Sequence, residues 1–237
     1  MAERNTPLIR DGGERDVAAF LEALARTPSR GDGAGKGRLL FGLDATGSRQ
    51  QTWDRAARLQ AEMFLAAAGC GGLVMQICFY RGFGEFRVGR WTEDGGALVR
   101  MMSAVACRAG ETQIIKVLEH ALNVARHERL AAVVFVGDCC EESIDRLAGR
   151  AGELGLLGVP AFMFHEGDDA HAATVFREVA RLSGGAYCQF DSSSAEVLKD
   201  LLCAVAVFAA GGRQALDRLA ITGGEAVRRI AHQMQRR

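Results

Sequence analysis

The residues with the clearest chemical pattern follow the first apolar run of the chain. The run Leu39-Leu40-Phe41-Gly42-Leu43 ends at Asp44, and hydroxyl side chains follow at every second position, Thr46 and Ser48. In an extended or tightly turning loop, side chains offset by two positions can converge on one side. All three offer oxygen, the ligand type that hard cations such as Mg2+ prefer. One carboxylate and two hydroxyls favour an open metal site, in which one coordination position is left for another molecule.

Further ligands for such a site must come from other loops at the same edge of a sheet. Asp138 follows the apolar run 133–137, and Thr112 lies in AGETQ, directly before a helical pattern that begins at Gln113. In open parallel sheets, ligands bind beyond the carboxyl ends of the strands. Three loops therefore supply the candidate metal ligands, which are Asp44, Thr46, Ser48, Thr112 and Asp138.

The elements that position these loops alternate along the chain. Apolar runs typical of strands occupy residues 39–43, 73–79, 132–137, 159–164 and 186–190. Apolar residues at helical spacing occupy residues 50–68, 113–127, 143–155, 171–182 and 194–210. Because most strand runs are apolar on both faces, we expect a mostly parallel sheet with helices on both faces. The segments LVMQICFY and EFRVGRW, joined by RGFG, predict one hairpin with an antiparallel edge strand.

This alternation predicts a single α/β domain of the Rossmann-like, doubly wound class. We place the domain at residues 37–212. Residues 1–36 are expected to hold a short amphipathic helix, 14–26, and a Gly-rich linker. Residues 213–237 are expected to form a helical extension with a basic last helix. Each terminal helix can either fold back on the domain or bind a partner, and folding back is the simpler expectation.

The three loops together resemble the metal-ion-dependent adhesion site (MIDAS) of von Willebrand factor A domains, in a bacterial single-domain form. The resemblance covers D-x-T-x-S after the first strand, Thr112 before a later helix and Asp138 after another strand. It continues through GVPAFMFHEGDD, VFREVARLSGGAYCQF and SSAEVLKDLL. It implies that Thr46, Ser48 and Thr112 bind Mg2+, or Mn2+ or Ca2+, directly. Asp44 and Asp138 would bind the cation or its waters, and an Asp or Glu carboxylate of a partner protein would fill the vacant position.

The sequence departs from the family pattern at three places. Thr46 stands where serine is commoner, which keeps the hydroxyl oxygen. Glu111 precedes Thr112 where glycine is frequent, and we consider it a candidate acid behind the ligands. Asp138 is followed by Cys139-Cys140 rather than glycine, and we interpret these two thiols as inert residues that fill the loop. Taken alone, D-x-T-x-S is also compatible with an Asx turn or a helix N-cap that binds no metal.

Composition narrows the classes of function. The 29 basic residues balance 29 acidic ones, which argues against a nucleic-acid-binding protein or a membrane-surface protein. The longest apolar run, 201–210, is shorter than the roughly 20 residues that a bilayer requires. The first residues do not match a signal peptide, so we expect a cytoplasmic protein. The excess of arginine over lysine is typical of GC-rich bacteria, and the seven cysteines lack CxxC spacing and are expected to be reduced.

Three functions are compatible with these residues. The first is a metal-dependent protein-interaction module without enzymatic activity. The second is a Mg2+-dependent phosphohydrolase with Asp44 as nucleophile. The sequence has no second acid two residues after Asp44 for this reaction. The third is a metal-free scaffold that binds through its terminal helices. His165 and His171 are interpreted as parts of a solvated segment, in which Asp168 and Asp169 complement a helix N-terminus.

Overall fold

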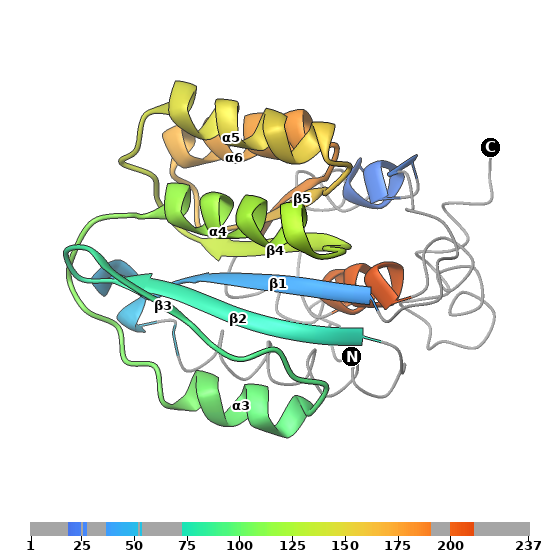
Figure 1. The fold of residues 1–237 in the computed structure, drawn as a ribbon. Helices are drawn as coiled ribbons and strands as arrows, with labels where there is room; N and C mark the ends of the chain where they lie inside the picture. The colour runs from blue at the N-terminus through green and yellow to red at the C-terminus, as the bar shows by residue number, and fades with distance from the viewer. Residues whose placement is uncertain are drawn as a thin grey trace, which may run out of the picture.

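A six-stranded sheet forms the centre of the computed structural model (Figure 1). The structure describes residues 19–24, 26–27, 37–51, 53, 73–190 and 200–210. The strand order is β3-β2-β1-β4-β5-β6, and the strands are β1 (Gly37–Asp44), β2 (Leu73–Arg81), β3 (Glu85–Val88), β4 (Ala132–Gly137), β5 (Ala161–Glu166) and β6 (Tyr187–Phe190). All neighbours pair in parallel except β2 and β3. Because β1 lies between β2 and β4, the loops that follow β1 and β4 are neighbours at one edge of the sheet.

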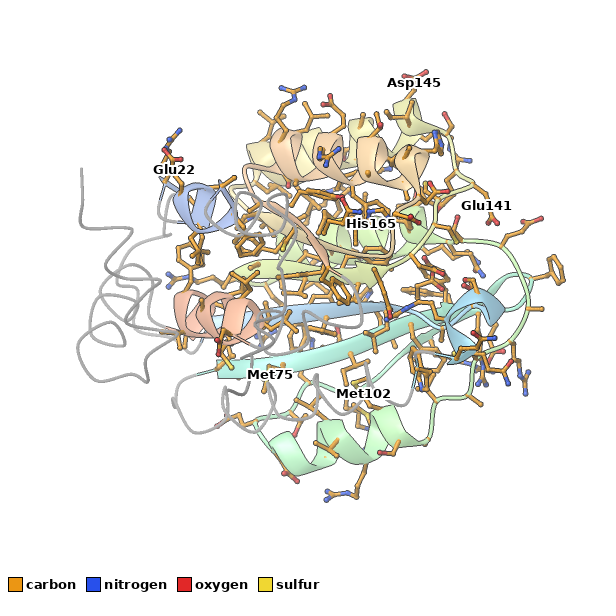
Figure 2. The ribbon with its side chains drawn as sticks, turned by 180° about the vertical axis from the view of Figure 1, so that it is seen from behind. Glu22, Met75, Met102, Glu141, Asp145 and His165 are labelled. Carbon is orange, nitrogen blue, oxygen red and sulfur yellow. The ribbon has the colours of Figure 1, made fainter. Side chains whose placement is uncertain are left out.

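Helices cover both faces of this sheet. One face carries α4 (Ile114–His127), α5 (Ile144–Leu156) and α6 (Ala170–Ser183) (Figure 1). The opposite face carries α3 (Gly95–Ser103) and the helical residues 200–210. Met75 of β2 and Met102 of α3, labelled in Figure 2, are buried in the hydrophobic cluster of this second face. The predicted fold class, a mostly parallel α/β sheet with one antiparallel edge strand, is therefore confirmed.

The apolar runs form central strands because their side chains alternate between two hydrophobic cores. In β1, Leu39, Phe41 and Leu43 belong to the core shared with α3, whereas Leu40 belongs to the core shared with α4 to α6. Burial of both faces removes apolar surface from water along the whole strand, which offsets the cost of ordering it. The edge strand β3 is only half-buried or exposed, consistent with its alternating polar residues.

The hairpin and most element positions agree with the sequence predictions. The turn between β2 and β3 contains Gly82 and Gly84 at φ values of 58° and 85°, a backbone region that favours glycine. Helix α3 is an addition, because the sequence pattern had not assigned its range. It begins with two glycines, poor helix formers that weaken the helical pattern at its start. The predicted helix 50–68 lies mostly outside the described residues, which show a short 3-10 helix, η1 (Gly47–Gln51), at its beginning.

The described part of the N-terminal helix folds back onto the domain. Residues 19–24 and 26 are helical, and Phe20, Leu21 and Leu24 are buried in the core. The Phe20 ring lies 5.1 Å from the ring of Phe164 between centroids. Residues 1–18, 28–36 and 211–237 lie outside the described residues, so the domain limits at 36/37 and 212/213 stay predictions. Within the described ranges, no helix is both long and apolar enough to span a bilayer.

Candidate metal centre

The centre is built on Asp44, the last residue of β1. Its side chain is completely buried, and Oδ1 accepts a hydrogen bond of 2.8 Å from the backbone N–H of Thr46. Oδ2 accepts a hydrogen bond of 3.0 Å from the Tyr80 hydroxyl of β2. The Asx-type turn that the sequence left open is therefore present. It holds the carboxylate at the strand end, and the loop that carries both hydroxyls continues from there.

The two hydroxyls of this loop lie together. Thr46 Oγ1 is 3.1 Å from Ser48 Oγ; the Thr46 side chain is buried, while Ser48 is exposed. The loop passes close to the segment after α3, since Thr46 forms a parallel bridge with Arg108. A Cβ added at Gly47 would lie 3.1 Å from the Cα of Ala109, so glycine permits this close approach. The D-x-T-x-S loop thus places the Ser48 hydroxyl at the surface, and the Thr46 hydroxyl and the Asp44 carboxylate in buried positions.

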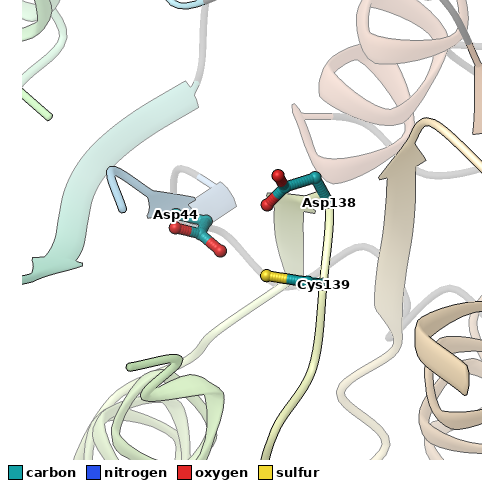
Figure 3. Close-up of side chains that lie close together, drawn as sticks. All are labelled: Asp44, Asp138 and Cys139. Carbon is teal, nitrogen blue, oxygen red and sulfur yellow. The ribbon is translucent and has the colours of Figure 1, made fainter. Parts of the chain in front are cut away.

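Asp138, directly after β4, completes a group of three ligand-type side chains. Ligand atoms of Asp44, Asp138 and Cys139 all lie within 4.8 Å of one another (Figure 3). Oδ1 of Asp138 is buried and has no hydrogen-bond partner among the described residues. Cys139 Sγ is also 4.0 Å from Ser48 Oγ, so the loop after β4 contacts the D-x-T-x-S loop, which we call the hydroxyl loop. An unpaired buried carboxylate oxygen costs free energy unless a cation or another donor satisfies it.

The electrostatics of this group favour a positive charge. Burial raises the pKa of Asp44 from 3.8 to about 6, although hydrogen bonds from Thr46 and the charge of Arg49 lower it, and the neighbouring charge of Asp138 raises it further. Burial, with smaller contributions from Asp138 and Asp44, raises the pKa of the Cys139 thiol to about 12. The thiol is therefore protonated at neutral pH in the absence of a metal. Two carboxylates and a thiol share one partly buried place, where a divalent cation would be stabilised.

Arg49 connects the start of the hydroxyl loop to the end of β5. Its guanidinium is fully buried and donates to the Asp44 carbonyl at 2.8 Å. Its Nε and Nη2 atoms donate to Oε2 of Glu166, at the end of β5, at 3.0 and 2.7 Å. One side chain thus links the ends of β1 and β5. Sequence reasoning did not find this role, because the pattern placed Arg49 only next to a predicted helix.

His165 binds the main-chain oxygen of Asp138. It is completely buried at the end of β5, with Nε2 3.2 Å from the Asp138 carbonyl and Nδ1 2.9 Å from the Tyr187 hydroxyl (Figure 2). Burial lowers its pKa, so the ring is neutral; Nε2 donates to the carbonyl and Nδ1 accepts from Tyr187. The prediction that His165 lies in a solvated segment is wrong, because β5 continues two residues beyond the apolar run. The neighbouring prediction for Asp169 is confirmed, since Asp169 caps α6 through Ala172 N–H at 2.6 Å.

Thr112 is held by the loop that follows Asp138. Its hydroxyl accepts the Glu141 N–H at 3.0 Å, and its own N–H donates to Glu141 Oε2 at 2.8 Å. The next residue, Glu142, accepts the N–H groups of Ile114 and Ile115 at the start of α4. Among the predicted ligands, the described contacts group Asp44 with Asp138 and Thr46 with Ser48. They attach Thr112 to the neighbouring loop instead.

The remaining predicted and unpredicted residues have clear positions. Glu111, the candidate acid behind the metal ligands, is exposed. The sequence patterns assigned no role at the site to four residues that lie there, Cys139, Tyr80, Glu141 and Glu142. Cys139 immediately follows Asp138 in the sequence, which places its thiol near the same strand end, and the interpretation of this thiol as inert stays a prediction. The thiols of Cys78, Cys107, Cys139 and Cys140 form no disulfide with another described residue.

Comparisons with known proteins bear on the fold. No protein-family model matches the sequence, and no curated protein matches it. Among solved structures, the SpRpn10 VWA domain superposes with a TM-score of 0.57 at 13% identity, covering 70% of this chain and 94% of that one. The von Willebrand factor type A protein from Catenulispora acidiphila gives 0.59 at 17% identity, covering 73% of this chain and 43% of that one.

A third solved structure, the PilB minor pilin from Streptococcus sanguinis, gives a TM-score of 0.56 at 9% identity, covering 82% of this chain and 65% of that one. The chain thus spans less than two thirds of the length of these last two proteins. Identities this low establish the shared architecture alone. The chain has the fold of von Willebrand factor type A domains.

Proposed function

We propose that the protein is a divalent-metal-dependent protein-interaction module. Its site would hold Mg2+, or alternatively Mn2+ or Ca2+, between Asp44, Asp138, Thr46, Ser48 and Thr112. A partner protein would supply an Asp or Glu carboxylate to the open side. Domains of this fold commonly mediate protein–protein interaction, which favours a binding role over catalysis.

The observation that carries this proposal is the pair of carboxylates at neighbouring strand ends. Asp44 is buried with a raised pKa, and Asp138 has a buried oxygen without a hydrogen-bond partner among the described residues. Like charges this close repel each other, and a divalent cation would neutralise both. The same cation would attract a third carboxylate from a partner, which the two acids alone would repel.

The hydroxyl loop fits an octahedral cation. Neighbouring oxygen ligands of Mg2+ are about 3.0 Å apart when each lies about 2.1 Å from the ion. Thr46 Oγ1 and Ser48 Oγ are 3.1 Å apart. Ser48 is exposed, while Asp138 and Cys139 are half-buried, so the group can be reached from solvent on this side. The Thr112 hydroxyl accepts one hydrogen bond and keeps a second lone pair, so it could join the ligand set after a shift of its loop.

Calorimetric titration of Mg2+ and Mn2+ into metal-free protein tests the site. We expect one ion to bind the native chain, and Asp44→Ala, Asp44→Asn and Asp138→Ala each to lose it. Asp168→Ala is the matched control, because it removes an exposed carboxylate outside the group. Equal binding by the native chain and the Asp44 variants would contradict the proposed site.

A second experiment tests the interaction itself. The native chain, immobilised with Mg2+ or Mn2+, should retain a partner protein that EDTA releases. Asp44→Ala should not retain it, whereas Asp168→Ala should. A partner that stays bound in EDTA would contradict a metal-dependent interaction.

The structure supports the two alternative functions less well. As the nucleophile of a phosphohydrolase, Asp44 would need an accessible carboxylate, but both of its oxygens accept hydrogen bonds in a fully buried position. As a metal-free scaffold, the chain would bind through its terminal helices. The described part of the N-terminal helix uses Phe20, Leu21 and Leu24 for its own core, which leaves that apolar face unavailable. The last helix, 225–237, lies outside the described residues.

A further inference from the structure

The third member of the strand-end group is a thiol, not an oxygen. Cys139 Sγ lies within 4.8 Å of ligand atoms of both Asp44 and Asp138, and Figure 3 shows all three side chains pointing toward the same space. In a site that holds only Mg2+, the sulfur atom would not bind the ion, because Mg2+ takes oxygen ligands. The thiol therefore calls for an explanation that the all-oxygen site does not give.

We propose that Cys139 makes this site selective for a thiophilic divalent cation, Zn2+, over Mg2+. The inference rests on the proposed metal site and changes the ion that fills it. Asp44, Asp138 and Cys139 then form the protein ligands. The fourth position stays open for water or for the carboxylate of a partner.

The donor chemistry supports this choice. Thiolate and carboxylate are both established Zn2+ ligands, and three protein ligands with one open position are typical of Zn2+ sites that accept a further group. Thiolate ligands select Zn2+ over Mg2+, which prefers carboxylate, carbonyl and water oxygens. Among the described residues, Asp44, Asp138 and Cys139 are the one group of three metal-ligating acids, thiols or imidazoles this close together.

The geometry requires small movements. Two ligands of one tetrahedral Zn2+ are about 3.5 Å apart, given Zn–S and Zn–O distances of about 2.3 and 2.1 Å. The three ligand atoms lie within 4.8 Å of one another, so side-chain rotations of Cys139 and Asp138 can bring them together. Both residues are half-buried and lie in the loop after β4, where no strand pairing restrains them. Oδ1 of Asp138 has no hydrogen bond to a described residue that it would lose.

Metal binding must displace the thiol proton. The S–H bond of Cys139 is replaced by an S–Zn bond, and the proton is released to solvent. Cys107 is a second thiol near the same carboxylates: burial raises its pKa to about 11, and the charges of Asp44 and Asp138 add to this rise, while that of Arg49 opposes it. A soft metal bound at Cys107 would give the same signal, so the experiment must separate the two thiols.

The test uses the full chain and Co2+, which binds zinc sites and reports a thiolate ligand by a charge-transfer band in the near ultraviolet. Zn2+ affinity is measured by competition against Co2+, and Mg2+ affinity by calorimetry. The variants are Cys139→Ser, Cys107→Ser and Cys140→Ser. Cys140 is the matched control, because its thiol is directed to the Glu142 carbonyl at 3.8 Å instead of the group.

We expect the Co2+ band in the native chain, in Cys107→Ser and in Cys140→Ser, and its loss in Cys139→Ser. Zn2+ affinity should fall by more than about 100-fold in Cys139→Ser, since removing even a residue that only orients a ligand costs about 10–100-fold. Mg2+ affinity should change little. Zn2+ binding that is unchanged in Cys139→Ser would overturn this inference and leave the proposed metal site intact. Failure of every divalent ion to bind, with Asp44→Ala like the native chain, would overturn both.

Discussion

Glu166 and the Asp44–Asp138 pair lie at the carboxyl ends of neighbouring strands. Their negative charges are balanced in different ways. Glu166 at the end of β5 accepts two hydrogen bonds from the buried guanidinium of Arg49. Arg49 donates to the main-chain oxygen of Asp44, whereas the Asp44 carboxylate accepts hydrogen bonds from the neutral Thr46 N–H and Tyr80 hydroxyl. Asp138 keeps a buried oxygen without a described partner.

The difference separates a structural acid from acids available for a ligand. The Glu166 carboxylate is paired with a buried guanidinium, so its charge is neutralised within the chain. The hydrogen bonds to the Asp44 carboxylate come from neutral donors, and the charge of Arg49 offsets only part of the effect of burial, so a proton or a bound cation would stabilise the Asp44–Asp138 pair.

Removing Arg49 should have the largest effect on stability. Arg49→Met leaves Glu166 without its cation and removes the hydrogen bond to the Asp44 carbonyl. Breaking a buried ion pair by removing one partner costs about 3–5 kcal/mol. We expect a loss of this size in the free energy of unfolding, measured with urea at pH 7. The double variant Arg49→Met with Glu166→Gln should recover part of it, and a double variant no better than the single one would contradict a mainly electrostatic role.

Replacing Asp44 should act in the opposite direction in metal-free protein. Its pKa is raised from 3.8 to about 6, so the fold is favoured by this group below its unfolded pKa, and that contribution is lost as the pH rises through about 6. Asp44→Asn removes the penalty, because it cannot ionise. In EDTA, we expect the variant to gain up to about 3 kcal/mol over the native chain between pH 4 and pH 7.5.

Asp169→Asn is the matched control for this pH series. It makes the same chemical change at the N-cap of α6, where asparagine is as good a cap as aspartate. Its stability relative to the native chain should vary little over the same pH range. A native chain that keeps the same stability difference from Asp44→Asn at pH 4 and pH 7.5 would show that the carboxylate is not strained by burial. With a bound cation, the native chain should become the more stable of the two.

The contacts around Thr112 should give the smallest effect. Glu142 accepts two N–H groups in the first turn of α4, which otherwise lack partners within the helix. Glu142→Ala should cost about 1–2 kcal/mol, comparable to the loss of a helix cap, and should speed amide hydrogen exchange at Ile114 and Ile115. Glu141→Ala is the control, since among the described residues the exposed Glu141 carboxylate accepts the Thr112 N–H and no N–H group of α4. Equal exchange rates in the two variants would contradict a capping role for Glu142.

Sequence patterns predicted the strands and the main helices because burial on both faces leaves long apolar runs. The hairpin was equally readable, since the RGFG connection has glycines where the turn needs positive φ. The order of strands, with β1 between β2 and β4, placed Asp44 and Asp138 at the same edge as expected. The proximity of these two residues could therefore be anticipated from topology.

Side-chain partners in the centre could not be anticipated in this way. Arg49, His165 and Glu142 reach across 117, 27 and 28 residues of sequence, and no periodicity records such a contact. His165 follows an apolar run and precedes EGDD, so local composition indicated solvent while the strand register indicated the core. The attachment of Thr112 to Glu141 depends on how two loops meet, which local propensity does not specify.

The central position of β1 also sets when the centre can form. Ser48 and Cys139 are 91 residues apart in sequence, and their loops meet because β1 pairs with β4. Long-range pairing of this kind slows folding, and we expect the contacts of the centre to form after the rate-limiting step. A cation held by the centre would therefore leave the refolding rate nearly unchanged and would act by slowing unfolding. Metal would prolong the lifetime of the folded molecule without guiding its assembly.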